Sequence, residues 1–305
     1  MAELRDYEER TYKALVAREN RYARQVQRVL LDALNAMRAE MTVIYEKYAS
    51  DGVLTLAQMT QYNRLQSLEK QVLAELDAAT RKAVGTIDKL RPEQYGESFF
   101  RHAWAVDNAT GLRLRWGQLN RAAVLESLNN RDYQLAVTTY RPDARVKILR
   151  ALNNGLAQGK SYTQMAKDIK GAINATYAQA IRIIRTEGMT AINAGTDAAY
   201  TVAEERGVKM GRRWVATLDD RTRDDHRSMD GVETQEDGLF HLPNGETAPF
   251  PAWQGLSSGE RINCRCTESA IIEGYEPALR RTREQGVIPY QTYEQWSGLH
   301  AKRWR

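Results

Sequence analysis

Cysteine is almost absent from this sequence, and its scarcity excludes one way of stabilising a fold. Only two of the 305 residues are cysteines, Cys264 and Cys266, and one residue separates them. A disulfide between them would close a small strained ring and would link no distant segments. The sequence therefore excludes a framework of disulfides, and the close pair of cysteines needs another explanation.

Long apolar runs are also absent. Charged residues interrupt the apolar positions between residues 4 and 16, so the N-terminus does not resemble a secretory signal. No stretch is long and apolar enough to cross a bilayer. The chain nevertheless has 42% hydrophobic residues, which can form a substantial core. We expect a soluble folded protein that is made and used in a cytoplasm.

Neither sign of charge dominates the chain. It has 44 Lys and Arg residues against 39 Asp and Glu residues, for a formal net charge of +5. This balance permits contact with nucleic acid without requiring it. The candidate residues for contact with nucleic acid or with a partner are Arg280, Arg281, Arg283, Lys302, Arg303 and Arg305. An ordinary solvated surface explains these residues equally well.

The first ninety residues show apolar side chains at every third or fourth position. Between residues 3 and 50 no Pro or Gly interrupts this pattern, which predicts one long amphipathic helix. Residues 50–52 would end it, and Thr55 can cap a second helix that we expect Pro92 to stop. The two helices would fold back as an antiparallel hairpin over residues 1–92.

Residues 93–207 are predicted to form a helical body of shorter pieces. We expect breaks at residues 108–111, 129–130, 141–142 and 153–159, and at Gly207. The stretch from Gly155 to Ser161 has three residues between its glycines, whereas a phosphate-binding loop needs four. Ser161 and Gln164 instead form a capping box that would start the next helix.

After Gly207 the composition changes. The residues around Trp214 favour a strand, turns become frequent, and five of the seven prolines lie beyond residue 240. We predict a small α+β unit over residues 208–275, followed by a basic and aromatic tail over residues 276–305. The predicted fold class is therefore α+β: a mainly helical body with a long N-terminal helical hairpin and a small C-terminal α+β unit.

The densest group of polar and aromatic residues follows in that unit. It contains Trp214, the run from Asp219 to Arg223, His226, Gly231 and the closing Asn263-Cys264-Arg265-Cys266, with Arg185-Thr186-Glu187 upstream on a helix. In this order the elements resemble the phage Mu F-like minor head protein family, whose members act in phage head morphogenesis. The resemblance covers about residues 140–272 and leaves the N-terminal hairpin unexplained.

This resemblance implies a minor head (capsid) protein of a tailed bacteriophage. Such a protein would be associated with the portal or the inner capsid, act in head morphogenesis, and take part in DNA packaging or delivery. Its expected partners are the phage portal protein, the major capsid protein and, through non-specific contact, DNA. Its expected place is the virion, reached from the host cytoplasm during assembly.

The chemistry of the group admits two structural interpretations. On an extended segment the sulfurs of Cys264 and Cys266 face the same side, so with His226, and with His241 or an Asp such as Asp219, they could hold a structural zinc ion. Alternatively, no metal is required, and a hydrogen-bonded clasp holds the unit. The residues of that clasp would be Arg185, Glu187, Trp214, Asp219, Arg221, Arg223, His226, Gly231 and Asn263.

An enzymatic interpretation competes with both. Asp219, Asp220, Asp224, Asp225 and His226 could hold a divalent ion, as in a metal-dependent nuclease or another DNA-processing enzyme carried by a phage. No second acid–base partner stands out, and adjacent carboxylates are common in solvated turns. We therefore predict a non-enzymatic protein with no catalytic residue. A host-directed effector, injected with the genome, is a third alternative.

Overall fold

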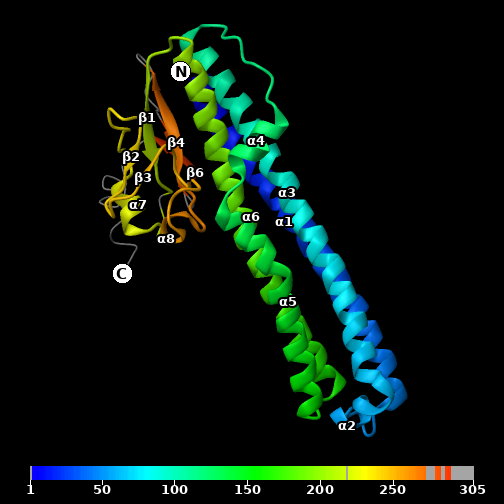
Figure 1. The fold of residues 1–305 in the computed structure, drawn as a ribbon. Helices are drawn as coiled ribbons and strands as arrows, with labels where there is room; N and C mark the ends of the chain where they lie inside the picture. The colour runs from blue at the N-terminus through cyan, green and yellow to red at the C-terminus, as the bar shows by residue number, and fades with distance from the viewer. Residues whose placement is uncertain (1, 218, 273–278, 283–285, 290–305) are drawn as a thin grey trace. The chain divides into compact units, whose positions relative to one another are not determined.

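The computed structural model describes the backbone of residues 2–217, 219–272, 279–282 and 286–289 (Figure 1). It is mainly helical, with short antiparallel strands near the C-terminus, and the predicted fold class is confirmed. The chain divides into two compact units. Unit 1 combines residues 1–19, 90–130 and 185–305, and unit 2 combines residues 20–89 and 131–184. Within the described residues, no helix has both the length and the hydropathy of a membrane span.

The helices are α1 (Ala2–Tyr48), α2 (Leu56–Thr60), α3 (Arg64–Thr110), α4 (Arg121–Leu128), α5 (Arg131–Ala157), α6 (Tyr162–Glu205), α7 (Asp224–Ser228) and α8 (Ser258–Arg261), with a 3-10 turn η1 (Gln61–Asn63). The strands are β1 (Met210–Val215), β2 (Phe240–His241), β3 (Thr247–Ala248), β4 (Thr267–Ile272), β5 (Leu279–Thr282) and β6 (Gly286–Pro289). They pair antiparallel as β1 with β4, β2 with β3, and β5 with β6.

The long first helix is confirmed as α1, which ends just before the predicted break at residues 50–52. Thr55 caps α2 as predicted, and Gln58 completes a capping box with it. The sequence did not indicate the interruption that follows, where Tyr62 has a φ of 55° and lies in the left-handed region. After that turn α3 begins, and it lies beside α1 (Figure 1).

Pro92 does not stop a helix. It lies inside α3, so the predicted end there is wrong. A proline inside a helix costs about 3 kcal/mol, but each large apolar side chain that is fully buried contributes about 1.5–3 kcal/mol. Leu90, Phe99 and Val106 are all buried on α3 around and beyond the proline, and their packing outweighs its cost. Pro142 likewise lies inside α5, and the predicted break there is wrong as well.

The other predicted breaks are confirmed. The helices α3, α4, α5 and α6 end close to residues 108–111, 129–130, 153–159 and Gly207. Gly159 and Gly207 have φ values of 58° and 88°, which glycine adopts without the clash of a Cβ atom. The capping box before α6 is also present: the Gln164 N–H donates to Ser161 Oγ at 3.4 Å, and the Ser161 N–H donates to Gln164 Oε1 at 3.1 Å.

The compact units differ from the predicted domain boundaries. The predicted divisions at residues 92 and 207 separate contiguous segments, whereas both observed units combine segments that are distant in sequence. The reason is the length of α1, α3 and α6, each of which contributes one part to unit 1 and the other part to unit 2. The apolar residues of a long helix can serve two different cores.

Unit 2 is helical throughout. Its parts of α1, α3, α5 and α6 bury apolar side chains such as Met37, Leu76, Ile148 and Ile169. The Tyr45 hydroxyl on α1 donates to the carbonyl of Lys160 at 2.9 Å and so links α1 to the turn before α6.

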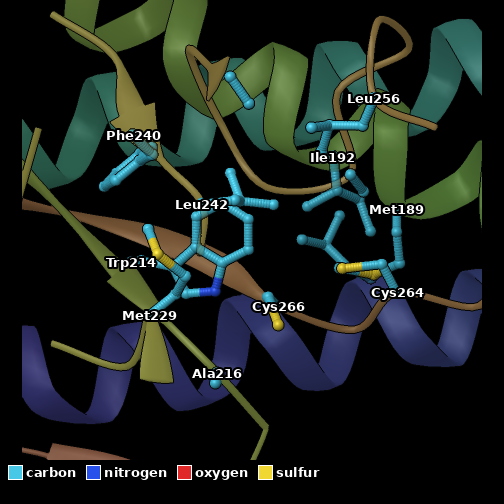
Figure 2. Packing of buried hydrophobic residues seen from close by; sticks show 13 residues of the cluster. Met189, Ile192, Trp214, Ala216, Met229, Phe240, Leu242, Leu256, Cys264 and Cys266 are labelled. Carbon is cyan, nitrogen blue, oxygen red and sulfur yellow. The ribbon is translucent and has the colours of Figure 1, made fainter. Parts of the chain in front are cut away.

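In unit 1 the predicted α+β segment packs against helices α1 and α6. The largest apolar cluster of unit 1 joins α1 and α6 to β1, to the loops and to both cysteines (Figure 2). The members are Leu15, Met189, Ile192, Trp214, Ala216, Met229, Phe240, Leu242, Ala248, Ala252, Leu256, Cys264 and Cys266. Trp214 is 0% exposed, and its ring meets those of Phe240 and His226 edge-on at 5.3 and 5.6 Å. The segment therefore has no separate core of its own.

Candidate functional site

The Asn-Cys-Arg-Cys segment connects α8 to β4 and is tied to α6 by side-chain hydrogen bonds. Asn263 has a φ of 57°, which turns the chain sharply, and its N–H donates to Thr186 Oγ1 at 3.1 Å. Asn193 Nδ2 donates to the Cys266 carbonyl at 2.9 Å, and Thr217 Oγ1 donates to the Arg265 carbonyl at 2.9 Å. These bonds hold the segment in place against α6 and the end of β1.

The two cysteines of this segment meet His226 of α7. Cys264 Sγ and Cys266 Sγ lie 3.6 and 3.3 Å from His226 Nδ1, and all three residues are buried. The other ring nitrogen, Nε2, lies 2.8 Å from Glu260 Oε2 at α8. The sequence alone suggested the Cys-Cys-His grouping, but gave no sign that Glu260 would contact the histidine.

The electrostatics of the group differ from residue to residue. Burial opposes a charge on His226, but the hydrogen bond and the charge of Cys266 outweigh it and raise the pKa of the imidazole. Burial, together with the neighbouring Cys264, raises the pKa of the Cys266 thiol well above its ordinary value. The hydrogen bond from Cys266 lowers the pKa of Cys264, although burial opposes this.

Asp219 anchors the turn between β1 and α7. Its carboxylate accepts two hydrogen bonds from Arg265, of which the bond from Nη2 to Oδ1 is 2.7 Å long. The Arg221 N–H and the Thr222 hydroxyl donate to the same Oδ1 at 3.0 and 3.2 Å. Burial alone would raise the pKa of Asp219, but these bonds outweigh it and lower the pKa. The carboxylate is thus engaged with the turn and with Arg265.

Glu187 joins α6 to α8 inside unit 1. Its carboxylate pairs with Arg261, and its other oxygen lies 3.4 Å from Arg91 Nε. Arg223 donates to the carbonyls of Glu260 and Ile262 and so holds the end of α8 from the side of α7. Glu187 therefore links α6 to α8, and Arg223 links the start of α7 to the end of α8.

Other residues of the predicted clasp contribute less. The side chain of Arg185 is 59% exposed and lies 3.9 Å from Glu19. Arg221 and Asn263 are exposed, and each donates a hydrogen bond through its backbone N–H group, to Asp219 and to Thr186 respectively. Gly231 has a φ of 82°, and its N–H donates to the Trp214 carbonyl at 2.9 Å.

His241 lies apart from the cysteines. It is on β2, and its Nε2 lies 2.8 Å from Asp237 Oδ2 near the surface. In the described part of the chain, the only group of three or more close metal-ligand side chains is His226, Cys264 and Cys266. The acidic cluster of the nuclease interpretation is not assembled either, because Asp220 and Asp224 are exposed and Asp219 pairs with Arg265.

Several residues that build the site were not among the predicted site residues, although some of them lie in the motifs that the sequence shows. They are Thr186, Asn193, Glu260, Arg261 and Arg265. Most lie within or next to the recognised motifs, so proximity to those motifs was the available signal. Of the basic candidates, Arg280 and Arg281 lie on β5 but their side chains are not described, and Arg283, Lys302, Arg303 and Arg305 lie outside the described residues.

Comparison with known proteins finds the same resemblance that the sequence motifs indicated. A family model described as "Phage Mu protein F like protein" matches residues 146–269. Minor head protein GP7 of Bacillus phage SPP1 is 27% identical over 281 residues, which cover 90% of this chain and 91% of that protein. Uncharacterized protein YqbB of Bacillus subtilis is 27% identical over 143 residues, 45% of this chain and 46% of that protein.

A protein of Enterococcus faecalis named NAD(+)–arginine ADP-ribosyltransferase EFV is also similar. It is 27% identical over 248 residues, which cover 80% of this chain, but the chain spans only 50% of that protein's length. No solved structure matches the chain.

Proposed function

From the similarity of this chain to phage Mu F-like proteins and to minor head protein GP7, we propose that it belongs to the phage Mu F-like minor head protein family and binds the portal or the inner face of the capsid. A role in phage head morphogenesis, as a component of the head, follows from the family itself. Portal or capsid binding, and help in DNA packaging or delivery, extend that role. The observation that carries the proposal is the alignment with minor head protein GP7, which covers 90% of this chain and 91% of the relative.

We also propose that the protein is not an enzyme. Several polar residues between Trp214 and Cys266 are engaged in hydrogen bonds and ion pairs inside unit 1. Asp219 is bound by Arg265, and His226 lies between Glu260 and the cysteines. A hydrolytic centre would need several carboxylates or histidines that converge on an ion accessible to substrate. The described residues of this segment supply buried contacts instead.

The surface feature most typical of an interface lies on α3 in unit 1. Phe100 and Trp104 are 50% and 46% exposed, and they line a hollow together with Arg18 and Arg101. Exposed aromatic residues with arginine beside them are enriched where proteins bind one another. We propose that this surface contacts the portal or capsid protein.

Co-purification tests the proposal. The tagged chain would be expressed together with the portal and major capsid proteins of the phage that carries it, and the complex would be isolated and its stoichiometry measured. We expect one of the two head proteins to be retained and the F100S/W104S double variant to lose most of this binding. L135S is the matched control, because Leu135 is also exposed, at 60%, but lies on α5 in unit 2.

Two results would contradict the proposal. One is a folded chain that binds neither head protein while assembled heads from the same phage lack it. The other is turnover: arginine-linked transfer of ADP-ribose from NAD⁺, as the name of the Enterococcus relative suggests, or DNA cleavage with Mg²⁺ or Mn²⁺ that is lost in Asp219→Ala. We expect neither reaction with the purified chain.

A further inference from the structure

The buried group at the junction of α7 and β4 is arranged as a metal site. We propose that His226 Nδ1 and the sulfurs of Cys264 and Cys266 bind one zinc ion, which joins α7 to the segment before β4. The site is distinct from the proposed portal or capsid contact on α3. Its role is structural: it holds together a part of unit 1 whose strands and helices are very short.

The spacing of the donors fits zinc. Zinc binds thiolate sulfur at about 2.3 Å and imidazole nitrogen at about 2.0–2.1 Å, so a tetrahedral ion places sulfur and nitrogen about 3.5 Å apart. The observed Sγ to Nδ1 distances are 3.6 Å for Cys264 and 3.3 Å for Cys266. All three donor atoms lie within 4.8 Å of one another. Thiolate and imidazole donors in this number favour zinc over calcium or magnesium.

A hydrogen-bonded group without metal explains this geometry less well. The Nδ1 atom of a neutral imidazole has one lone pair and can accept one hydrogen bond, or it carries a proton and can donate one. Two sulfurs nevertheless approach the same nitrogen, and both residues are buried in an apolar cluster. A metal ion between the three atoms would accept a lone pair from the nitrogen and from each sulfur, so all three would be coordinated at once.

The surroundings of His226 orient it for this role. Ligand histidines usually donate their second ring N–H to a carboxylate or carbonyl, which fixes the ring and its tautomer. Here His226 Nε2 lies 2.8 Å from Glu260 Oε2, so that Nδ1 faces the sulfurs. The Trp214 and His226 rings lie edge to face with their centroids 5.6 Å apart, and this contact limits the rotation of the imidazole. Glu260 is therefore a positioning residue and not a ligand.

The charges also agree with a bound dication. Two thiolates would be costly to bury among apolar side chains without a compensating positive charge. A zinc ion with two thiolates and a neutral imidazole forms a neutral group. Among the residues that the structure describes, neither His241 nor Asp219 supplies a fourth ligand, because His241 contacts Asp237 and Asp219 contacts Arg265.

Metal analysis of the full chain tests this inference. Purified without chelators, the chain should contain one zinc ion per molecule by mass spectrometry of the metal. Replacement with Co²⁺ should produce the intense near-ultraviolet absorption of a cobalt–thiolate bond. Cys264→Ser, Cys266→Ser and His226→Ala should each lose the ion, whereas His241→Ala, the matched control, should keep it. Glu260→Gln should keep one ion but bind it about 10–100-fold more weakly in competition with a chelator.

The inference is wrong if the folded chain contains no zinc and its cobalt form lacks thiolate absorption. Metal that stays bound in the Cys264→Ser/Cys266→Ser double variant also overturns it. The cobalt spectrum is measured on the unaltered chain, so the test holds even if a variant fails to fold. Portal or capsid binding is assayed separately and does not depend on this result.

Discussion

Arg261, at the end of α8, pairs with Glu187 on α6, and both side chains are almost fully buried. The two residues are 74 positions apart in the sequence. Removing one partner of a buried ion pair leaves a buried charge without compensation, which costs about 3–5 kcal/mol. Arg91 lies beside the same carboxylate, so the loss of Glu187 would affect two arginines.

We therefore expect Glu187→Ala to lower the free energy of unfolding of unit 1 by about 3–5 kcal/mol. Unit 2 contains no tryptophan, whereas Trp104, Trp116, Trp214 and Trp253 belong to unit 1, so tryptophan fluorescence during denaturant unfolding reports unit 1. Glu205→Ala, at an exposed position near the end of the same helix, should change stability by less than about 0.5 kcal/mol. Equal effects of the two variants would show that the buried pair does not stabilise unit 1.

The helices α3 and α6 approach each other closely at Gly195. A Cβ atom there would overlap the backbone carbonyl of Tyr95, which cannot move as a flexible side chain could. Gly195→Ala should destabilise unit 1 by at least about 1–3 kcal/mol. Gly171→Ala is the matched control on the same helix, because its added Cβ would meet no atom within 4 Å. This control should stabilise the chain by about 0.5–1 kcal/mol, since alanine favours a helix over glycine. The melting temperatures of the two variants test this. A melting temperature of Gly195→Ala equal to that of the unaltered chain would contradict the close contact.

Glu268 on β4 makes stability depend on pH. It is buried, neither of its carboxylate oxygens has a hydrogen-bond partner among the described residues, and burial raises its pKa well above 4.5. The nearby Asp197 adds to this shift, and burial raises its own pKa to about 6. The folded state therefore binds protons that the unfolded chain has released. The extra proton binding stabilises the folded state fully below the ordinary carboxyl pKa of the unfolded chain. This stabilisation is lost as pH rises through the raised pKa that the carboxyl has in the folded state.

We expect stability to fall as pH rises above about 4.5, by up to about 1.4 kcal/mol per pH unit for each proton involved. Glu268→Gln should reduce this slope and stabilise unit 1 at pH 7–8. Glu236→Gln, at an exposed position, should leave the slope as it is. Unfolding midpoints measured between pH 5 and 8 test this, and parallel curves for Glu268→Gln and the unaltered chain would refute it.

Trp214 occupies the centre of the cluster that includes both cysteines. It is 0% exposed, so Trp214→Ala should destabilise unit 1 by about 3–5 kcal/mol. Trp104→Ala removes the same side chain from a site that is 46% exposed, and should cost less than about 1 kcal/mol. The comparison also separates folding from partner binding, because Trp104 belongs to the proposed interface. A large loss of stability in Trp104→Ala would remove it from consideration as a binding residue.

Features that depend on neighbouring residues could be predicted from the sequence. The capping groups at Thr55 and Ser161, the helix ends near Gly159 and Gly207, and the strand around Trp214 are of this kind. Each depends on backbone angles and hydrogen bonds within a few positions, so the residue types at those positions determine it. The pairing of Cys264 and Cys266 on one side of the chain was predictable for the same reason.

Only the tertiary structure decided how distant residues combine. Helix α3 continues through Pro92 because its buried side chains outweigh a local cost. Glu187 meets Arg261 across 74 positions, and His226 rather than His241 meets the cysteines, because the path of the backbone brings α6, α7 and α8 together. Sequence patterns report local preference, whereas packing selects among partners of equal chemical suitability. The sequence by itself therefore determined the local elements of this protein and its resemblance to phage Mu F-like proteins, and the tertiary structure determined which residues form its buried site.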